Sequence, residues 1–237
     1  RSVSRPMPRP RRDELRQEFS NAIKDTARAH MRQNGTAGIS LRAIARDLDV
    51  TAPAIYNYFA RLDDLITALI VDAFNALGET METASQAAAN AGLRAQFRAA
   101  LLAYRAYAVG NPTDFELIYG NPIPGYTAPA EITVPLASRP LLLLLDLALQ
   151  IIPYGFTVTP REFEPPAAVL AYFAGWKPQA GLAHVPDDLL YTMLVGWSRI
   201  HGVVMLELFD HLPPTVGDTA AFYAQQVDYM ISLFDPP

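Results

Sequence analysis

Residues 39–69 decide the fold of this chain, and they read ISLRAIARDLDVTAPAIYNYFARLDDLITAL. Ser40 and Thr51 are residue types that cap helix N-termini, and each precedes a short run with apolar residues at helical spacing. Pro53 falls in the first turn of the second run, where the missing N–H of proline is tolerated, so the Thr51 hydroxyl would accept from Ala54. Residues 47–50 carry a turn. The stretch therefore predicts two short helices joined by a tight turn, which is the helix-turn-helix arrangement.

A longer helix precedes this pair and another follows it. Residues 13–34 place apolar side chains three and four positions apart, and Gly35 ends the pattern. Asp63 and Asp64 put negative charge at the start of the following helix, expected over 63–89, where the helix dipole favours it. In the second short helix and this long one we expect an inward face formed by Ile55, Phe59, Leu65, Ile66, Leu69, Ile70, Ala73, Phe74 and Leu77.

The rest of the chain is also predicted to be helical, because no alternation of period two persists for more than a few residues. The expected helices are 93–109, 112–119, 134–152, 165–176, 186–209 and 217–234. The predicted fold class is all-α. The predicted domains are a flexible basic arm over 1–12, a helix-turn-helix domain over 13–62 and a larger helical domain over 63–237.

Composition excludes several classes of protein. The chain has no cysteine, so disulfides, thiolate metal sites and cysteine nucleophiles are excluded. The most apolar window, 132–152, contains two prolines, an arginine and an aspartate, which favours a buried helix over a membrane span. The N-terminus is rich in arginine and proline and has no apolar segment, so it is not a signal peptide, and we expect a cytoplasmic protein.

The net charge of −5 hides an asymmetry along the chain. Residues 1–62 hold 12 Lys and Arg against 6 Asp and Glu, a net of +6. Residues 63–237 hold 7 against 18, a net of −11. A polyanionic partner such as double-stranded DNA is therefore expected at the N-terminal quarter alone.

Within residues 13–77 the sequence closely resembles the DNA-binding region of TetR-family transcriptional regulators, most clearly at Val50, at Ile55-Tyr56-Asn57-Tyr58-Phe59 and at Leu65. A second resemblance lies at Trp197-Ser-Arg-Ile-His201-Gly202, which is similar to the signature of the WHG-type ligand-binding subgroup. The resemblance implies a homodimeric repressor that binds a palindromic operator with half-sites roughly 34–36 Å apart. It also implies that a small molecule in the C-terminal domain releases the DNA by moving the fourth helix.

The same resemblance, carried over position by position, implies the DNA contacts. They are Ser40, Arg42, Thr51, Ala52, Pro53, Ala54, Tyr56, Asn57, Tyr58 and Arg61. Tyr56 and Tyr58 have packing against the helix bundle as their alternative role. Two departures from the family pattern matter: Leu62 stands where many members have a lysine, and residues 47–60 contain two aspartates and no cation.

The opening of the second short helix, Ala52-Pro53-Ala54, offers no side-chain hydrogen bond to DNA. Its methyl and methylene groups can still pack on thymine methyls. We therefore expect few direct hydrogen bonds to bases, chiefly from Thr51 and Asn57, and a larger share of shape readout.

In the C-terminal region aromatic residues are concentrated where an apolar or planar effector would bind. The expected contacts are Tyr104, Tyr107, Phe115, Tyr119, Tyr172, Trp176, Trp197 and His201; Tyr126, Phe156 and Phe173 belong to the same aromatic concentration. His201 could be a buried structural residue, an effector contact or a metal ligand. The other histidines do not have the spacing of a metal site. Arg94, Arg98 and Arg105 share a stripe that we expect to be solvated. The last two helices, over 186–209 and 217–234, carry apolar faces that would form a four-helix dimer contact.

Two other classes of function remain open on these patterns. An enzyme is one, although the sequence has no G-x-S-x-G, H-E-x-x-H or glycine-rich phosphate loop. A helical protein-interaction module with an incidental basic end is the other. We expect no metal and no cofactor other than the unknown effector.

The cations missing from residues 47–60 must come from Arg42, Arg46, Arg61 and the arm, in particular Arg5, Arg9, Arg11 and Arg12. Deleting residues 1–12 is expected to flatten the salt dependence of DNA binding by roughly 0.9 log units per lost phosphate contact. Titration of a duplex across a salt series measures this slope. An unchanged slope would mean that the arm is a solvated tail with no part in DNA binding.

Overall fold

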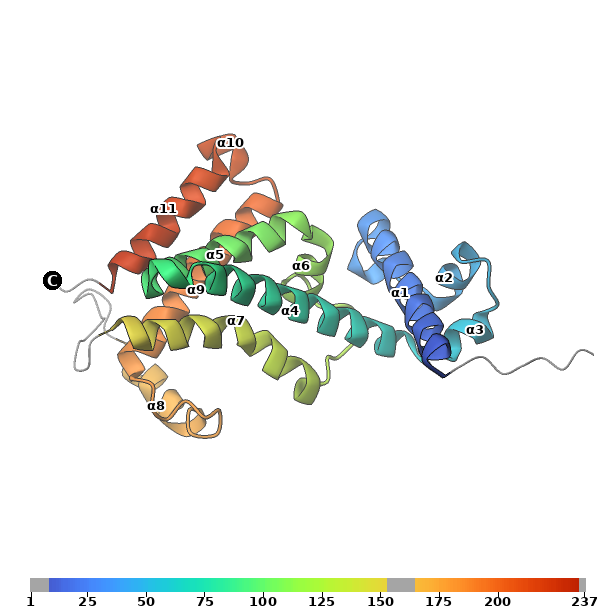
Figure 1. Cartoon of the computed structure of the whole chain (residues 1–237), viewed down its shortest axis with the longest axis horizontal. Helices are drawn as coiled ribbons and strands as arrows, with labels where there is room; N and C mark the ends of the chain where they lie inside the picture. Colours follow the sequence, from blue (N-terminus) through green and yellow to red (C-terminus); the bar gives the residue numbers. More distant parts are fainter. Residues whose placement is uncertain (1–8, 153–164, 235–237) are drawn as a thin grey trace, which may run out of the picture. The chain divides into compact units, whose positions relative to one another are not determined.

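The structure is a computed structural model, and it describes residues 9–152 and 165–234. These residues form helices and contain no strand, which confirms the all-α class (Figure 1). The α-helices are α1 Arg9–Asn34, α2 Leu41–Asp47, α3 Ala52–Tyr56, α4 Leu62–Ala87, α5 Leu93–Gly110, α6 Pro112–Tyr119, α7 Ala130–Ile151, α8 Ala167–Trp176, α9 Asp187–Leu208, α10 Pro213–Val216 and α11 Thr219–Ser232. Two short 3-10 helices, Thr36–Gly38 and Ala89–Ala91, lie in the connections.

Helices α1 and α7 each begin four residues earlier than the sequence predicts, whereas the other predicted boundaries differ by at most two residues. Helix α1 begins at Arg9, so the last four residues of the predicted arm are helical, and the part over 1–8 lies outside the described residues. Helix α7 begins at Ala130 rather than Val134 and contains Pro135 and Pro140. Proline lacks a backbone donor, which made the start of α7 hard to place from sequence.

The described residues divide into two compact units. The first contains the residues up to 74 together with Asn111–Val134, and the second contains Asn75–Gly110 and the residues from 135 onward. Helix α4 contributes to both. This division differs from the predicted boundary at residue 62, because the segment that carries α6 packs with the first unit.

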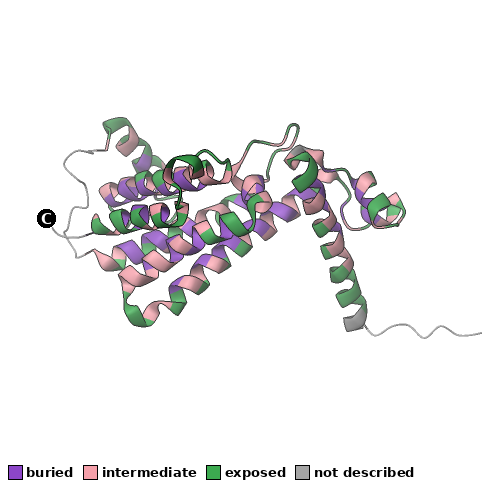
Figure 2. Ribbon diagram, turned by 90° about the horizontal axis from the view of Figure 1, so that it is seen from above, coloured by how far each residue is buried: buried purple, intermediate pink, exposed green. Residues whose placement is uncertain are grey.

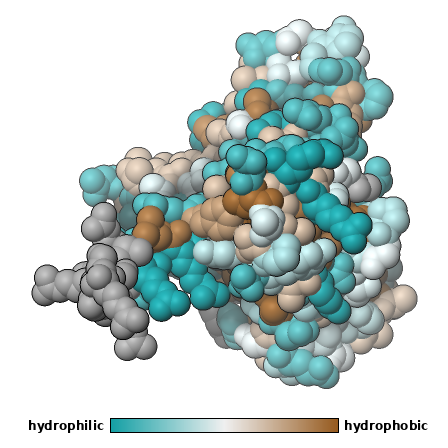
Figure 3. All heavy atoms as spheres, turned by 90° about the vertical axis from the view of Figure 1, so that its right-hand side faces the viewer, coloured by the Kyte–Doolittle hydropathy of each residue, from teal (hydrophilic) through white to brown (hydrophobic). Residues whose placement is uncertain are grey.

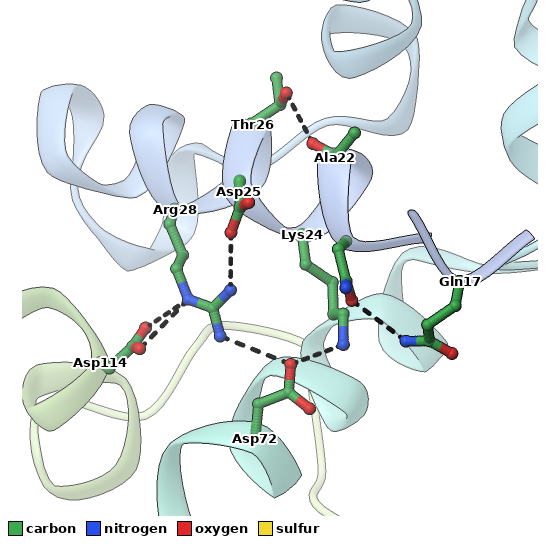
Figure 4. Close-up of polar contacts among 9 residues, drawn as sticks. Gln17, Ala22, Lys24, Asp25, Thr26, Arg28, Asp72 and Asp114 are labelled. Carbon is green, nitrogen blue, oxygen red and sulfur yellow. Dashed lines mark hydrogen bonds and ion pairs between the residues drawn. The ribbon is translucent and has the colours of Figure 1, made fainter. Parts of the chain in front are cut away.

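Arg28 of α1 explains why α6 belongs with the first unit (Figure 4). Its guanidinium donates to both carboxylate oxygens of Asp114 on α6, at 3.0 and 3.1 Å, and also to Asp72 on α4. Lys24 adds a 2.7 Å ion pair to Asp72. Burial by itself lowers the pKa of Arg28, but the carboxylates of Asp114, Asp72 and Asp25 outweigh this effect and raise it. The network fixes α1 to α4 and α6.

The inward face predicted for α3 and α4 is confirmed. Ile55, Leu65, Leu69 and Leu77 are fully buried, and Phe59 is 8% exposed. Buried residues recur along the faces on which the helices pack against one another (Figure 2).

In the second unit α5, α9 and α11 pack against one another. Gly196 allows close approach of α9 and α11, since a Cβ there would lie 2.5 Å from the methyl carbon of Met230. Tyr223 of α11 is fully buried and its hydroxyl donates to the carbonyl of Leu101 on α5 at 2.7 Å. Phe97 and Phe234 meet edge to face, with ring centroids 5.2 Å apart. These contacts form the core of the second unit.

The arginine stripe on α5 is half-buried and paired rather than a fully solvated face, which corrects the prediction. Arg94 donates to the carbonyls of Ile231 and Phe234, at the end of α11. Arg98 pairs with Asp228 at 2.6 Å. The sequence hid this role because each partner lies more than 100 residues further along the chain.

Arg105, the third arginine of that stripe, makes a two-pronged ion pair with Glu207 of α9. Thr219 of α11 donates to the same carboxylate at 2.7 Å. Burial tends to raise the pKa of Glu207, but the hydrogen bonds from Arg105 and Thr219 lower it overall. The pair joins three helices of the second unit.

Among the described residues, α7 and α9 are long and apolar enough to cross a membrane by length and composition. Core helices of water-soluble proteins pass the same test. Arg139 of α7 pairs with Glu82 of α4, and Glu207 of α9 pairs with Arg105, so both helices direct charge into contacts within the second unit. These contacts are typical of packed helices in a helical domain.

Replacing Arg28 with alanine is expected to lower the free energy of unfolding by about 1–3 kcal/mol, because the partly buried carboxylates of Asp114 and Asp72 lose this cation. Urea denaturation measures the change. Arg32→Ala, at an exposed arginine of the same helix, is the matched control and should change stability by less than about 0.5 kcal/mol. Equal effects of the two substitutions would show that the network contributes no stability.

Candidate nucleic-acid interface

The turn between α2 and α3 sets the direction of the second helix. Asp49 adopts a left-handed conformation with φ of 53°, which aspartate tolerates better than most side chains. The N–H of Val50 returns to the carbonyl of Ala45 at 2.9 Å. Helices α2 and α3 pack against each other, with Leu41, Ile44 and Ile55 buried. The predicted helix-turn-helix is present.

Ser40 and Thr51 occupy the predicted N-cap positions, but neither side chain makes a capping hydrogen bond within the described structure. The prediction that the Thr51 hydroxyl accepts from the N–H of Ala54 is wrong. That N–H instead bonds to the backbone carbonyl of Thr51 at 2.9 Å. Both residues are exposed, so their hydroxyls are left facing solvent.

The side chains predicted to contact DNA are mostly exposed. Figure 3 shows the molecule from the side that lies at the right of Figure 1, where hydrophilic and hydrophobic surfaces are interspersed. Ile55 and Phe59 lie underneath, in the core. The exposed residues are Ser40, Arg42, Thr51, Pro53, Tyr56, Asn57 and Arg61, and the half-buried ones are Ala52, Ala54 and Tyr58. An exposed polar and methyl-rich surface over a fixed apolar base can meet the edges of bases.

The cations around α3 differ in how they are paired. Arg46 lies 3.6 Å from Asp47, and Arg61 lies 3.5 Å from Asp63. All of these side chains are substantially exposed, so the pairs are weak and can be exchanged for phosphates. Arg42 is exposed and has no ion pair among the described residues.

Asp47, at the end of α2, is tied to α1. The ring Nε2 of His30 donates to its carboxylate at 2.6 Å, and His30 itself is 8% exposed. The hydrogen bond from His30, with smaller help from Arg46, holds the pKa of Asp47 below its usual value. This contact fixes the end of α2 next to the turn.

Tyr56 and Tyr58 have different surroundings. Tyr56 is 43% exposed. Tyr58 packs edge to face on Phe19, with ring centroids 5.1 Å apart, and the guanidinium of Arg16 lies over its ring at 5.4 Å. Arg16 was not among the predicted contacts; the signal in the sequence is its position three residues before Phe19 on the predicted helix.

In the second unit the predicted effector residues centre on His201. The Tyr104 hydroxyl and His201 Nδ1 are 2.8 Å apart, and Trp197 stacks on the imidazole with an interplanar angle of 19°. Tyr104 is 2% exposed and Tyr107 is 5% exposed. Burial lowers the pKa of His201, which favours the neutral ring.

The other predicted effector residues are distributed more widely. Phe115 and Tyr119 belong to the first unit, where Tyr119 contacts Phe115 and Phe74. Tyr172 is 72% exposed, so its ring does not line an enclosed space. Trp176 packs edge to face on Phe173. Phe156, from the same aromatic concentration, lies outside the described residues, and in the described part of the chain no cluster of metal-ligating side chains occurs.

Comparison with known proteins gives two family matches. Residues 23–69 match the family described as "Bacterial regulatory proteins, tetR family". Residues 97–230 match the family described as "Tetracyclin repressor-like, C-terminal domain". The second match covers more than half of the chain and includes Trp197, His201 and Gly202.

Full-length relatives agree with these matches. The HTH-type transcriptional regulators Rv1816 of Mycobacterium tuberculosis and Mb1846 of Mycobacterium bovis are each 30% identical over 200 residues, covering 84% of this chain and 84% of theirs. The solved structure of SCO4313, described as a regulatory protein, superposes with a TM-score of 0.72 at 29% identity, covering 94% of this chain and 98% of that one. The TetR-family regulator PfmR of Thermus thermophilus shares the fold, with a TM-score of 0.56 at 14% identity over 91% and 99% of the two chains.

The lowered pKa of His201 predicts an acid-sensitive stability. The unfolded chain takes up this proton first as the pH falls, so the free energy of unfolding should decrease below pH about 6.5. In His201→Gln this part of the decrease should be absent. Urea denaturation of both proteins at pH about 7.5 and 5.5 measures the difference, above the range in which carboxylates titrate. The same decrease in both proteins would contradict the assignment.

Proposed function

Since the chain belongs to the tetR family of bacterial regulatory proteins, we propose that it is a ligand-responsive homodimeric repressor of a palindromic operator. Members of that family are DNA-binding transcriptional regulators, so this protein is a regulator and not an enzyme. The observation that carries the proposal is α3, which presents Thr51, Tyr56 and Asn57 to solvent while Ile55 is buried beneath it. We place it in the cytoplasm, where its DNA lies.

Readout of the operator would divide between α2 and α3. Thr51 and Asn57 supply hydrogen bonds to bases, and the methyl and methylene groups of Ala52, Pro53 and Ala54 pack on thymine methyls. In the proposed complex, Ser40, Arg42, Tyr56 and Arg61 would contact the phosphates. The exposed hydroxyls of Ser40 and Thr51, not used for capping, support these roles.

The homodimer would form through α9 and α11. An open groove of about 160 Å³ runs between them, lined in part by Tyr191, Val195, Gly196 and Leu233. Val195 is 43% exposed and Tyr229 is 49% exposed, so apolar surface beside the groove is open to a partner. Arg199 lies over the Tyr229 ring at 4.4 Å and supplies a polar edge. Isologous burial of this surface would set the distance between two α3 helices.

The effector would bind in the helical domain at Tyr104, Tyr107, Trp197 and His201. The His201 ring already contacts both the Tyr104 hydroxyl and the Trp197 ring. Trp176 and the exposed Tyr172 are further proposed contacts in the same unit. An apolar or aromatic molecule suits this lining, with His201 or Tyr104 as the polar anchor. A preference of about 1–3 kcal/mol for the DNA-incompetent state would lower operator affinity about 5–150-fold.

Selection of genomic fragments bound by the purified protein, followed by footprinting, tests operator binding. We expect protection of two half-sites roughly 34–36 Å apart. Asn57→Ala should weaken specific binding at least tenfold, while Asn90→Ala, at an exposed asparagine of the second unit, should leave it unchanged. Absence of any selected sequence, or equal effects of both variants, would contradict the proposal.

The dimer interface needs its own test. Val195→Glu would place a charge in the apolar groove and should convert the dimer to a monomer in analytical ultracentrifugation, with loss of joint protection of the two half-sites. Val109→Glu changes an equally exposed valine on α5 and should remain dimeric. A dimer that survives Val195→Glu would exclude this groove as its interface.

A further inference from the structure

A hollow beside the end of α3 is lined by Arg16, a positively charged residue that was not among the predicted DNA contacts. Its volume is about 320 Å³, and it is lined by residues in the N-terminal half of α1 together with Tyr58 and Phe59. The α1 residues are Asp13, Arg16, Gln17 and Ser20. Tyr58 and Phe59 directly follow the exposed Tyr56 and Asn57 in the sequence, so the hollow lies next to the C-terminal end of α3.

The Tyr58 ring holds the cation in this hollow. Arg16 is exposed, and its guanidinium carbon lies 5.4 Å from the centre of the ring, within the range of a cation–π interaction. Phe19 packs edge to face on the same ring and restricts its rotation. An arginine stacked on a fixed ring loses less side-chain freedom when it meets a phosphate.

Few cations surround α3, so another one there would add to the phosphate contacts that Arg42, Arg46 and Arg61 can make. Residues 47–60 contain no Lys or Arg, and the nearby Arg46 and Arg61 have aspartate partners. Arg16 forms no ion pair with any residue in the described ranges. Phosphate neutralisation by cations dominates the affinity of proteins for DNA.

Building on the proposed function, we propose that Arg16 is a further contact to the DNA backbone and that Tyr58 positions its guanidinium rather than contacting DNA itself. The half-buried Tyr58 acts through its ring face, so its hydroxyl is dispensable. Asp13, in the same hollow, opposes the phosphate and moderates the affinity.

A salt series with a 40-base-pair duplex of arbitrary sequence tests Arg16, because non-specific binding reports the phosphate contacts. Arg16→Ala should reduce the slope of log affinity against log salt by about 0.9 per subunit. Arg16→Lys, which keeps the charge, should retain most of the slope. Asp13→Asn should tighten binding at least twofold. Arg32→Ala, at an exposed arginine of the same helix, should leave the slope unchanged.

Variants of Tyr58 test the positioning role. Tyr58→Phe keeps the ring and should bind as the natural protein does, whereas Tyr58→Leu should weaken binding severalfold. In the double variant Arg16→Ala with Tyr58→Leu, the second substitution should add nothing to the first. Circular dichroism checks that each variant is folded. An exposed arginine and a Tyr-to-Phe change do not threaten folding.

The outcomes distinguish the Arg16 contact from DNA binding by the protein as a whole. If the natural protein binds the duplex and Arg16→Ala leaves the slope unchanged, the contact is wrong and the proposed function stands. If Tyr58→Phe weakens binding as much as Tyr58→Leu, the phenol contacts DNA directly and the positioning role is wrong. If the natural protein ignores the duplex even in dilute buffer, both proposals are overturned.

Discussion

A helix of five residues has no stability of its own in water, so α3 depends entirely on what lies beneath it. Ile55 is fully buried and Phe59 nearly so, and the turn at Asp49 and Val50 fixes the angle at which the helix leaves α2. The exposed side chains of α3 inherit their positions from this apolar base. Hydrophobic burial therefore positions the side chains of α3, and polar contacts from these side chains would then form the interaction with a DNA groove.

Ion pairs do a different task in this fold: they join helices that are distant in sequence. Arg28 bridges α1 to Asp72 and Asp114, and Arg105 bridges α5 to Glu207. Both guanidiniums are largely buried, and each has planar carboxylate partners that suit its geometry. Such pairs add specificity of packing more than net stability, because desolvation offsets much of their attraction. In the first unit this specificity keeps the α6 segment together with α1 and α4.

The sequence predicted the helices of α1 to α6 well, since periodicity, caps and turn residues are local signals. It predicted the inner face of α4 and the buried roles of Ile55 and Phe59 for the same reason. It was wrong about the α5 arginines, whose stripe resembles a solvated face until α9 and α11 cover it. The sequence also could not distinguish the role of Tyr56 from that of Tyr58. Only the structure shows that Phe19 and Arg16 surround Tyr58.

The amino-acid sequence by itself determined the all-α class, the helix-turn-helix and the family, because these depend on short-range patterns that tertiary packing did not override. Tertiary structure alone decided that the Arg16 guanidinium lies over the Tyr58 ring, that His201 forms a hydrogen bond with Tyr104, and that α6 packs with the DNA-binding unit. Each of these joins residues separated by about 40 to 100 positions. Their pairing depends on how helices pack in space, and no local preference of the chain encodes it.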